Sequence, residues 1–490
     1  MRVLLISTYE LGHQPFGVAS PAAWLAAKGA EVTCLDLSRE SLREEAVRAA
    51  GLIAFYVPMH TATRLAISVL ETVRALNPKA HMCFYGLYAP VNEVYLRAAG
   101  ADTVLGGEFE EGLARLVDQV SGESSSEHTE DLQADPVISL ARQKFVVPDR
   151  AGLPALARYA HLVMPDGSER VAGYTEASRG CKHLCRHCPI VPVYNGAFRI
   201  VERDVVLEDV RQQVSAGAQH ITFGDPDFFN GPTHGMSIVD AVHREFPSLS
   251  YDVTIKIEHL LQHARYLPLL RDTGCLFVTS AVEAVDDHIL EQLDKGHTRA
   301  DFLQVIEMFA DTGLTLQPTF VPFTPWTTLE GYRDLMQVLA EQGLVENVAP
   351  IQLAIRLLIP VGSRILELDE IQRRIGAFDS AALYYPWQHG DAAVDALACD
   401  LQQIVERSEK LGRSRTQIFE RLAARAWQEA DANVTASSNC RISRHPPQAR
   451  PGQPVPRLDE PWYCCAEPTQ DQLVSIGCAK ETARQPGAFV

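Results

Sequence analysis

Three cysteines stand close together in the string GYTEASRGCKHLCRHCPIVP, which covers residues 173–192. Cys181, Cys185 and Cys188 are spaced as Cys-x3-Cys-x2-Cys. Three thiolates on one loop can bind three irons of a 4Fe-4S cube and leave the fourth iron open. The open iron can chelate the amino and carboxylate groups of S-adenosylmethionine (SAM), and an electron from the cluster then cleaves a carbon-sulfur bond. The spacing therefore predicts radical chemistry at this loop.

A structural zinc ion is the alternative occupant of this loop. It would be held by the three cysteines together with His183 or His187, which lie among them. Zinc modules usually supply two separated pairs of ligands, and no second pair lies nearby in the sequence. The spacing therefore favours the iron-sulfur cluster over zinc.

The elements that must position this loop alternate between strand-like and helical patterns from residue 171 to about residue 360. The expected strands are 171–176, 219–223, 251–257, 275–283, 315–321 and 350–358, and the expected helices are 204–217, 235–245, 259–272, 300–312 and 329–342. Successive parallel strands with right-handed helical crossovers curl into a full or partial barrel, with function at the carboxyl ends of the strands. The cysteine loop follows the first expected strand, at the end where barrel chemistry takes place.

A second set of alternating elements lies ahead of the barrel. Short apolar strands are expected at 3–7, 31–36, 52–57, 81–85 and 103–105, with helical spacing between them. Such a pattern predicts an α/β fold with a parallel, Rossmann-like sheet. The expected organisation is a Rossmann-like domain at 1–120, a polar linker at 121–150, a partial (β/α)6 barrel at 151–363, a helical region at 364–439 and an extended tail at 440–490.

Composition and charge disfavour several classes of protein. The 490 residues carry 62 acidic and 44 basic side chains, and the resulting net charge of -18 disfavours a nucleic acid partner. No apolar run reaches the roughly 18 residues needed to cross a membrane, and the first residues are not typical of a signal peptide. With eleven cysteines, metal or thiolate chemistry is favoured over a disulfide scaffold. A cytoplasmic protein is expected.

Charged residues interrupt apolar strand-like runs at Lys256, Glu258 and Arg356. Such groups are costly to bury unless they are paired or face a polar cavity. They are therefore expected either to line the active site or to form one internal salt bridge.

The segment 150–360 resembles the radical SAM superfamily, and its three clustered cysteines match the cluster motif of that superfamily in full. The resemblance implies a 4Fe-4S cluster, SAM as a cofactor and an electron donor such as flavodoxin or ferredoxin.

The same resemblance implies a set of SAM contacts. Gly224 and Asp225, in the string FGDPDFF, occupy the place where relatives meet the amino group of SAM, and Glu283 matches a glutamate that contacts SAM. Glycine allows a close backbone approach, and a carboxylate can accept from an ammonium group. As the alternative, Asp225 and Asp227 could merely cap the next helix.

The string GGEFEEG at 106–112 resembles part of the cobalamin-binding domains that precede some radical SAM barrels. The resemblance implies that Gly106 and Gly107 could admit a corrin or its nucleotide tail. Relatives that ligate cobalamin through a histidine use Asp-x-His-x-x-Gly, whereas this chain reads ELGHQPFG, so ligation by His13 is not implied. Cobalamin is a candidate cofactor, and a fold that has lost the cofactor stays open as the alternative.

The string WYCCAEP at 462–468 resembles the tail of the CUAEP/CCAEP-tail radical SAM family, in which the first of the paired positions can be selenocysteine. Such a position asks for a soft, redox-active nucleophile. Cys464 and Cys465 are expected to be catalytic: they could bind a soft metal or metalloid, form a strained disulfide with each other or receive a group from the radical site. A disordered tail with incidental cysteines is the alternative.

Together these features predict a radical SAM enzyme with a transferase-type reaction on a small molecule, or on a soft element such as arsenic or selenium carried by the tail. A cobalamin-dependent radical methyltransferase is the first alternative, and a non-catalytic iron-sulfur sensor or scaffold is the second. An RNA methylthiotransferase is not expected, because no second cysteine trio precedes the barrel and the chain is acidic.

Overall fold

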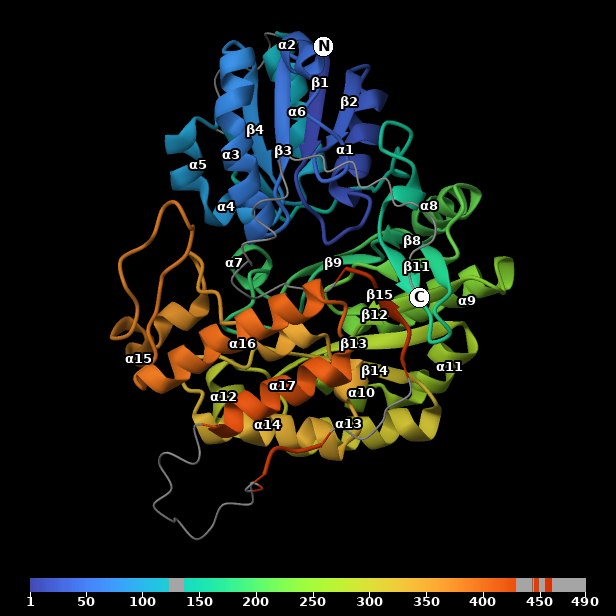
Figure 1. The fold of residues 1–490 in the computed structure, drawn as a ribbon. Helices are drawn as coiled ribbons and strands as arrows, with labels where there is room; N and C mark the ends of the chain where they lie inside the picture. The colour runs from blue at the N-terminus through green and yellow to red at the C-terminus, as the bar shows by residue number, and fades with distance from the viewer. Residues whose placement is uncertain (123–135, 429–442, 444, 449–453, 461–490) are drawn as a thin grey trace.

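The first of the two large sheets lies at one end of the molecule (Figure 1). The structure is a computed structural model that describes residues 1–122, 136–428, 443, 445–448 and 454–460. The strands of this sheet are β1 (Arg2–Ser7), β2 (Glu31–Asp36), β3 (Leu52–Tyr56), β4 (His81–Tyr85), β5 (Thr103–Gly107) and β6 (Ile138–Ser139). They pair in parallel in the order β2-β1-β3-β4-β5-β6. The expected Rossmann-like sheet is confirmed.

Helices cover both faces of this sheet. They are α1 (Phe16–Ala27), α2 (Glu44–Ala49), α3 (His60–Leu76), α4 (Tyr88–Val91), α5 (Glu93–Ala99) and α6 (Glu110–Ser121). Along β1, Val3 and Leu5 pack into one apolar core, and Leu4 and Ile6 pack into another. A parallel sheet buried on both faces needs apolar residues at successive positions. The strand order reverses between β1 and β3, and ligands usually bind at the carboxyl ends of the strands at such a point.

The second sheet is a curled half-barrel. Its parallel strands are β8 (Glu169–Thr175), β11 (His220–Phe223), β12 (Ser250–Thr254), β13 (Cys275–Glu283) and β14 (Thr315–Phe320). The short strands β7 (His161–Val163) and β15 (Arg457–Leu458) add an antiparallel edge beside β8. The helices between the parallel strands are α8 (Arg203–Ser215), α9 (Pro232–Glu245), α10 (Ile257–Gln262), α11 (Leu267–Asp272), α12 (Asp287–Gln292) and α13 (Arg299–Thr312).

The expected sixth strand at 350–358 is wrong. Pro350–Leu353 forms a 3-10 helix instead, and the contact of this segment with its neighbour is the isolated bridge between Phe323 and Arg356. The side chain of Gln352 explains the difference, because its Oε1 accepts a hydrogen bond at 3.1 Å from the backbone nitrogen of Phe320 in β14. A side chain thus takes a backbone donor that a sixth strand would have used, and the sheet ends at β14.

The strand expected at 251–257 also differs, because β12 ends at Thr254 and α10 begins at Ile257. Lys256 and Glu258 therefore lie beyond the carboxyl end of the strand and not inside it.

The C-terminal part of the described chain is helical, as expected, apart from 373–391. Three helices, α14 (Leu329–Glu341), α16 (Ala392–Lys410) and α17 (Arg415–Gln428), pack with the second sheet in one apolar core. Figure 1 shows α16 and α17 lying across this half of the molecule. Strand β15 then carries residues 457–460 back to the sheet edge. Across the described ranges, no helix has the length and apolarity needed to cross a membrane.

Candidate active site

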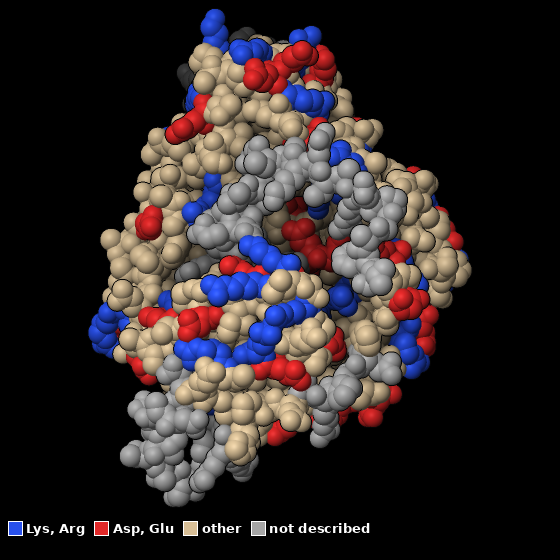
Figure 2. Space-filling model, in the orientation of Figure 1, with Lys and Arg blue, Asp and Glu red and all other residues tan. Residues whose placement is uncertain are grey.

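A cavity of about 380 Å³ lies between the carboxyl ends of the two sheets. The first sheet contributes residues that follow β1, β3, β4 and β5, and the second contributes residues at the ends of its five parallel strands. Figure 2 shows acidic side chains inside a hollow on one face of the molecule. Both kinds of sheet bind ligands at this end of their strands. The cavity is therefore the candidate active site.

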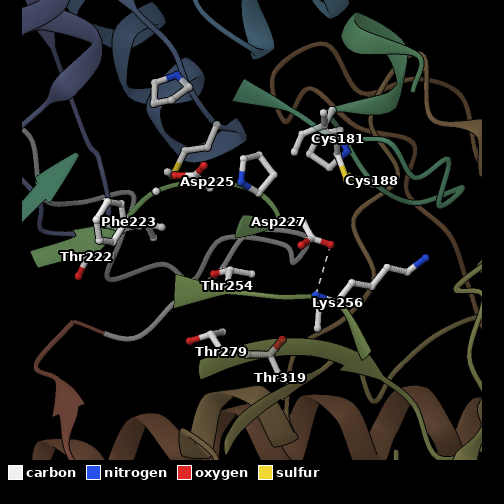
Figure 3. Close-up of a pocket in the computed structure, with 18 of the residues that line it drawn as sticks. Cys181, Cys188, Thr222, Phe223, Asp225, Asp227, Thr254, Lys256, Thr279 and Thr319 are labelled. Atoms are coloured by element: carbon white, nitrogen blue, oxygen red, sulfur yellow. Dashed lines mark hydrogen bonds between the residues drawn. The ribbon is translucent and has the colours of Figure 1, made fainter. Parts of the chain in front are cut away.

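The cysteine loop leaves the second sheet through β9 (Ser178–Gly180) and enters α7 (Val191–Tyr194). Cys181, Cys185 and Cys188 all line the cavity, and Figure 3 shows Cys181 and Cys188 near the ends of the barrel strands. Gly180 has a φ of 76°, and a Cβ there would collide with Tyr194 and the Ala197 carbonyl. The turn before Cys181 therefore requires glycine.

Backbone hydrogen bonds hold this loop from both sides. The nitrogen of Lys182 donates to Asn230 Oδ1 at 3.1 Å, and the nitrogen of Arg186 donates to the Leu293 carbonyl at 2.9 Å. Cys181 and Cys185 are thiols, not disulfides. Burial raises the pKa of Cys181 to about 11, so a thiolate at this position calls for a positively charged partner such as iron. The donor set thus fits an iron-sulfur cluster.

A row of threonines forms the polar wall of the half-barrel. Figure 3 shows Thr222, Thr254, Thr279 and Thr319, one from each of four neighbouring strands, and all four line the cavity. Alternate residues of a barrel strand face its interior, and hydroxyls at these positions keep the interior able to hydrogen-bond a ligand.

Asp225 lies at the cavity, directly after β11, and is 2% exposed. It accepts hydrogen bonds from the Ala177 nitrogen at 2.9 Å and from Ser178 Oγ at 2.5 Å. Burial raises its pKa to about 7. Gly224 also lines the cavity, and this position requires glycine because a Cβ there would collide with the Tyr174 hydroxyl. Asp225 thus positions the segment that precedes the cysteine loop.

Asp227 has the capping role that was the alternative for both aspartates. Its Oδ1 accepts from the Phe229 nitrogen at 2.9 Å and so caps the short 3-10 helix Phe228–Asn230.

Glu283 lies at the carboxyl end of β13, lines the cavity and is 5% exposed. Its Oε1 lies 3.1 Å from His187 Nε2 and 3.4 Å from Lys295 Nζ. Burial alone would raise the pKa of Glu283, but Lys295 and His187 hold it at about 2. Because His187 directly precedes Cys188, this ionised carboxylate also ties the cysteine loop to β13.

The charges in the apolar runs serve different purposes. Lys256 lines the cavity, and its Nζ lies 3.2 Å from Glu258 Oε2 and 3.1 Å from His183 Nδ1. Arg356 instead pairs with Asp395 at 2.6 Å and stacks over the Trp387 ring. Lys256 therefore combines the two expected roles, whereas Arg356 belongs to an internal salt bridge.

Arg179, which was not among the expected site residues, joins the two sheets at the cavity wall. Its guanidinium donates to Glu110 at 2.7 and 2.9 Å and to Glu176 at 2.6 Å, and it lies 3.5 Å from Glu108. Three aromatic rings lie within 5.0–5.6 Å of the guanidinium: Phe16, Phe109 and Phe145. Burial raises the pKa of Glu108 to about 7, against the opposing effect of Arg179. The acidic residues of the string GEFEEG were the feature of the sequence that could have indicated this cluster.

Of the two glycines of the expected corrin cradle, Gly107 lines the cavity, and neither position has room for a side chain. A Cβ on Gly106 would collide with Pro90, and one on Gly107 would collide with the Ser139 carbonyl. His13 lines the cavity and stacks on Tyr174 with ring centroids 4.8 Å apart. Burial lowers the pKa of His13 to about 4, so its imidazole is neutral.

Cys464 and Cys465 lie outside the described residues. The described chain ends at Glu460, which lines the cavity and accepts a hydrogen bond from the Tyr9 hydroxyl at 2.7 Å. Position 460 is therefore held at the cavity wall.

Comparison with known proteins gives a family match. Residues 175–336 match the sequence model of the Radical SAM superfamily. Two curated relatives are ribosomal protein uS12 methylthiotransferase RimO from Parabacteroides distasonis, 24% identical over 34% of this chain, and tRNA-2-methylthio-N(6)-dimethylallyladenosine synthase from Anaplasma phagocytophilum, 24% identical over 35%. The chain spans about two fifths of the length of these relatives, 40% and 41%.

Solved structures share more of the chain. The cobalamin-dependent SAM radical enzyme OxsB with aqua-cobalamin bound matches 83% of this chain and 67% of its own, with a TM-score of 0.65 and 14% identity. The radical SAM methyltransferase TsrM from Kitasatospora setae, with cobalamin and a [4Fe-4S] cluster bound, matches 88% of this chain and 99% of its own, with a TM-score of 0.58 and 14% identity. At this identity the likeness concerns the fold, and it extends across both sheets.

Proposed function

The chain carries a radical SAM domain at residues 175–336, and from it we infer an enzyme that holds a 4Fe-4S cluster through Cys181, Cys185 and Cys188 and cleaves SAM reductively. One observation supports this most directly: three cysteines of one anchored loop line a single cavity at the carboxyl ends of the barrel strands. A cluster bound there supplies one electron to the sulfonium of SAM. A reduced flavodoxin or ferredoxin is the proposed electron donor.

The test is anaerobic reconstitution with iron and sulfide, followed by dithionite and SAM. Mass spectrometry of the released fragment, adenosyl or aminocarboxypropyl, reports which carbon-sulfur bond breaks. If SAM stays intact under strong reduction, the alternative of a non-catalytic iron-sulfur sensor or scaffold is favoured.

We propose Gly224, Asp225 and Glu283 as the SAM-binding residues. Glu283 is ionised throughout the range in which the protein is handled, since its pKa is about 2, and Asp225 faces the cavity from the neighbouring strand end. Glu283→Gln and Asp225→Asn should each keep the cluster but weaken SAM binding about tenfold or more, because a hydrogen bond to a charged group contributes about 1.5–3 kcal/mol.

Equilibrium binding of SAM to the reconstituted variants measures this effect. Glu330→Gln is the control, since Glu330 is exposed on α14 away from the cavity lining. Unchanged SAM affinity in both variants would show that other residues bind the cofactor.

Cobalamin is the second candidate cofactor, which would make the enzyme a cobalamin-dependent methyltransferase. Cobalamin is bound in the solved structures of OxsB and TsrM, whose folds match this chain across both sheets. Gly107 lines the cavity, and Leu11, Met59 and Tyr88, which follow β1, β3 and β4, add an apolar roof that suits a corrin. Retention of hydroxocobalamin absorbance after gel filtration is the observation that favours this function.

We propose that the tail cysteines act on a group processed at the cavity, with a small molecule or a metalloid as substrate. Cys464 lies four residues beyond Glu460, which is held at the cavity wall. At about 3.3–3.6 Å per residue, four residues can span about 14 Å at most. The tail is thus attached at the wall of the cavity in which a group bound to its cysteines would react.

The double variant Cys464→Ser/Cys465→Ser should keep the cluster and cleave SAM without forming the coupled product. Arsenite serves as the soft-element probe, because adjacent thiols bind it through sulfur. Mass spectrometry of the arsenic species and of the tail peptide is the measurement, and Cys478→Ser, in the same tail, is the control. The same product formed at the parent rate by the double variant removes the tail from the chemistry.

A further inference from the structure

Beside the cysteine loop, three potential metal ligands converge from three separate elements. His183 belongs to the cysteine loop, Asp227 follows β11, and His259 lies on α10. Their ligand atoms, His183 Nε2, Asp227 Oδ2 and His259 Nδ1, lie within 4.8 Å of one another. Asp227 is 1% exposed and His259 is 6% exposed. Buried polar groups of this kind need a hydrogen-bond partner, an ion pair or a bound ligand.

Both imidazoles form ion pairs with Asp227, but neither contact has hydrogen-bond geometry. Nδ1 of His259 lies 2.8 Å from Asp227 Oδ2, and Nε2 of His183 lies 3.6 Å from the same oxygen. Both ring nitrogens are nevertheless buried with no partner in hydrogen-bond geometry. Ligands of one metal ion show this pattern, because their lone pairs point at a shared centre and not at each other.

Outer contacts of the kind that support metal ligands are also present. The second oxygen of Asp227 accepts from the Phe229 nitrogen at 2.9 Å, which fixes the carboxylate. Glu258 Oε2 lies 3.5 Å from His183 Nδ1, on the far side of the ring from Asp227. Lys256 Nζ lies closer to the same nitrogen, at 3.1 Å, and can only donate, so Lys256, held by its 3.2 Å pair with Glu258, orients the His183 ring.

We propose that His183, Asp227 and His259 bind one divalent transition-metal ion, of the zinc, iron or cobalt class, separate from the ion or cluster at the cysteines. Two imidazoles and one carboxylate form a borderline-soft ligand set with positions left open. His183 and Asp227 line the cavity, so an open position of the ion faces the candidate substrate. The ion ties the cysteine loop to the ends of β11 and β12, and it can hold an anionic or soft-element group of the substrate.

Zinc is the probe, added to the full-length protein after its cysteine loop has been reconstituted with iron and sulfide. Bound zinc and iron are counted per chain by elemental mass spectrometry after gel filtration, and absorbance near 400 nm follows the cluster separately. One zinc per chain is expected beyond the iron. His259→Gln and Asp227→Asn should each weaken zinc binding at least tenfold while the iron content stays that of the parent.

His263→Gln is the matched control, because His263 lies 5.6 Å from His259 between ring centroids but is not one of the three ligands. It should bind zinc as the parent does. Circular dichroism checks folding; if Asp227→Asn unfolds because it loses the Phe229 cap, His259→Gln alone decides. No zinc in the parent, or parent-like zinc affinity in His259→Gln, overturns the site, whatever the cluster result.

Discussion

Replacing Cys181, Cys185 or Cys188 singly with alanine will abolish the cluster absorbance at about 400 nm and all SAM cleavage. The parent should carry about four irons and four sulfides per chain at this loop. A cube held by two thiolates loses one of the protein bonds that retain it.

Cys399→Ser is the control for these variants, because Cys399 is an exposed cysteine on α16, away from the cavity lining. Iron, sulfide and zinc are measured together with the fragment released from SAM. Stoichiometric zinc with no iron in the parent protein would overturn the cluster and restore the structural zinc site.

Arg179→Met should produce the largest loss of stability, about 3–5 kcal/mol. Removing one partner of a buried ion pair leaves an uncompensated charge, and this cost is of that size. Here the remaining partners are the carboxylates of Glu108, Glu110 and Glu176. Methionine keeps much of the side-chain volume, so the effect arises from charge and not from a cavity.

The dependence of this loss on pH tests its cause. In the parent, burial alone would raise the pKa of Glu110, but Arg179 holds it below its usual value, so the pair stabilises the fold at neutral pH. Without Arg179 the folded-state pKa rises above the unfolded value. The loss of stability in the variant is therefore complete above this raised pKa. It disappears as the pH falls and the carboxylates take up protons.

Thermal unfolding midpoints of parent and variant between pH 5 and pH 8 measure this dependence, and the gap should narrow toward pH 5. Arg211→Met is the control, because Arg211 pairs with Glu208 and Glu245 on the exposed surface, where ion pairs contribute little. A gap that is independent of pH would show that packing, and not charge, explains the loss.

The Arg179 cluster also explains how the cavity keeps its shape. Glu110 begins α6 beside the first sheet, whereas Arg179 lies in β9 directly before the cysteine loop. A bidentate pair fixes both distance and orientation. The pair therefore holds the roof of the cavity at a set position over the three cysteines.

The long parallel strands of both sheets could be predicted from short apolar runs between turn residues, but the short edge strands β6, β7 and β15 could not, and β6 lies inside the expected linker at 121–150. The run VLLIS, for instance, supplies both cores of the first sheet from successive positions. The segment 350–358 reads equally apolar but forms a 3-10 helix, because Gln352 takes the backbone nitrogen of Phe320. Nothing in the local pattern reports a hydrogen bond made to a residue 32 positions away.

The cysteine loop was determined by the sequence alone, since three thiols within eight residues are near one another in any fold. Only the tertiary structure decided which groups surround that loop. Arg179 meets Glu110 from 69 positions away, and His187 meets Glu283 from 96. Ligand chemistry with short spacing is thus encoded locally, whereas these buried charges are matched only when segments far apart in the sequence come together. Which charged residues become neighbours depends on the packing of the whole chain, and the types of the single residues do not reveal it.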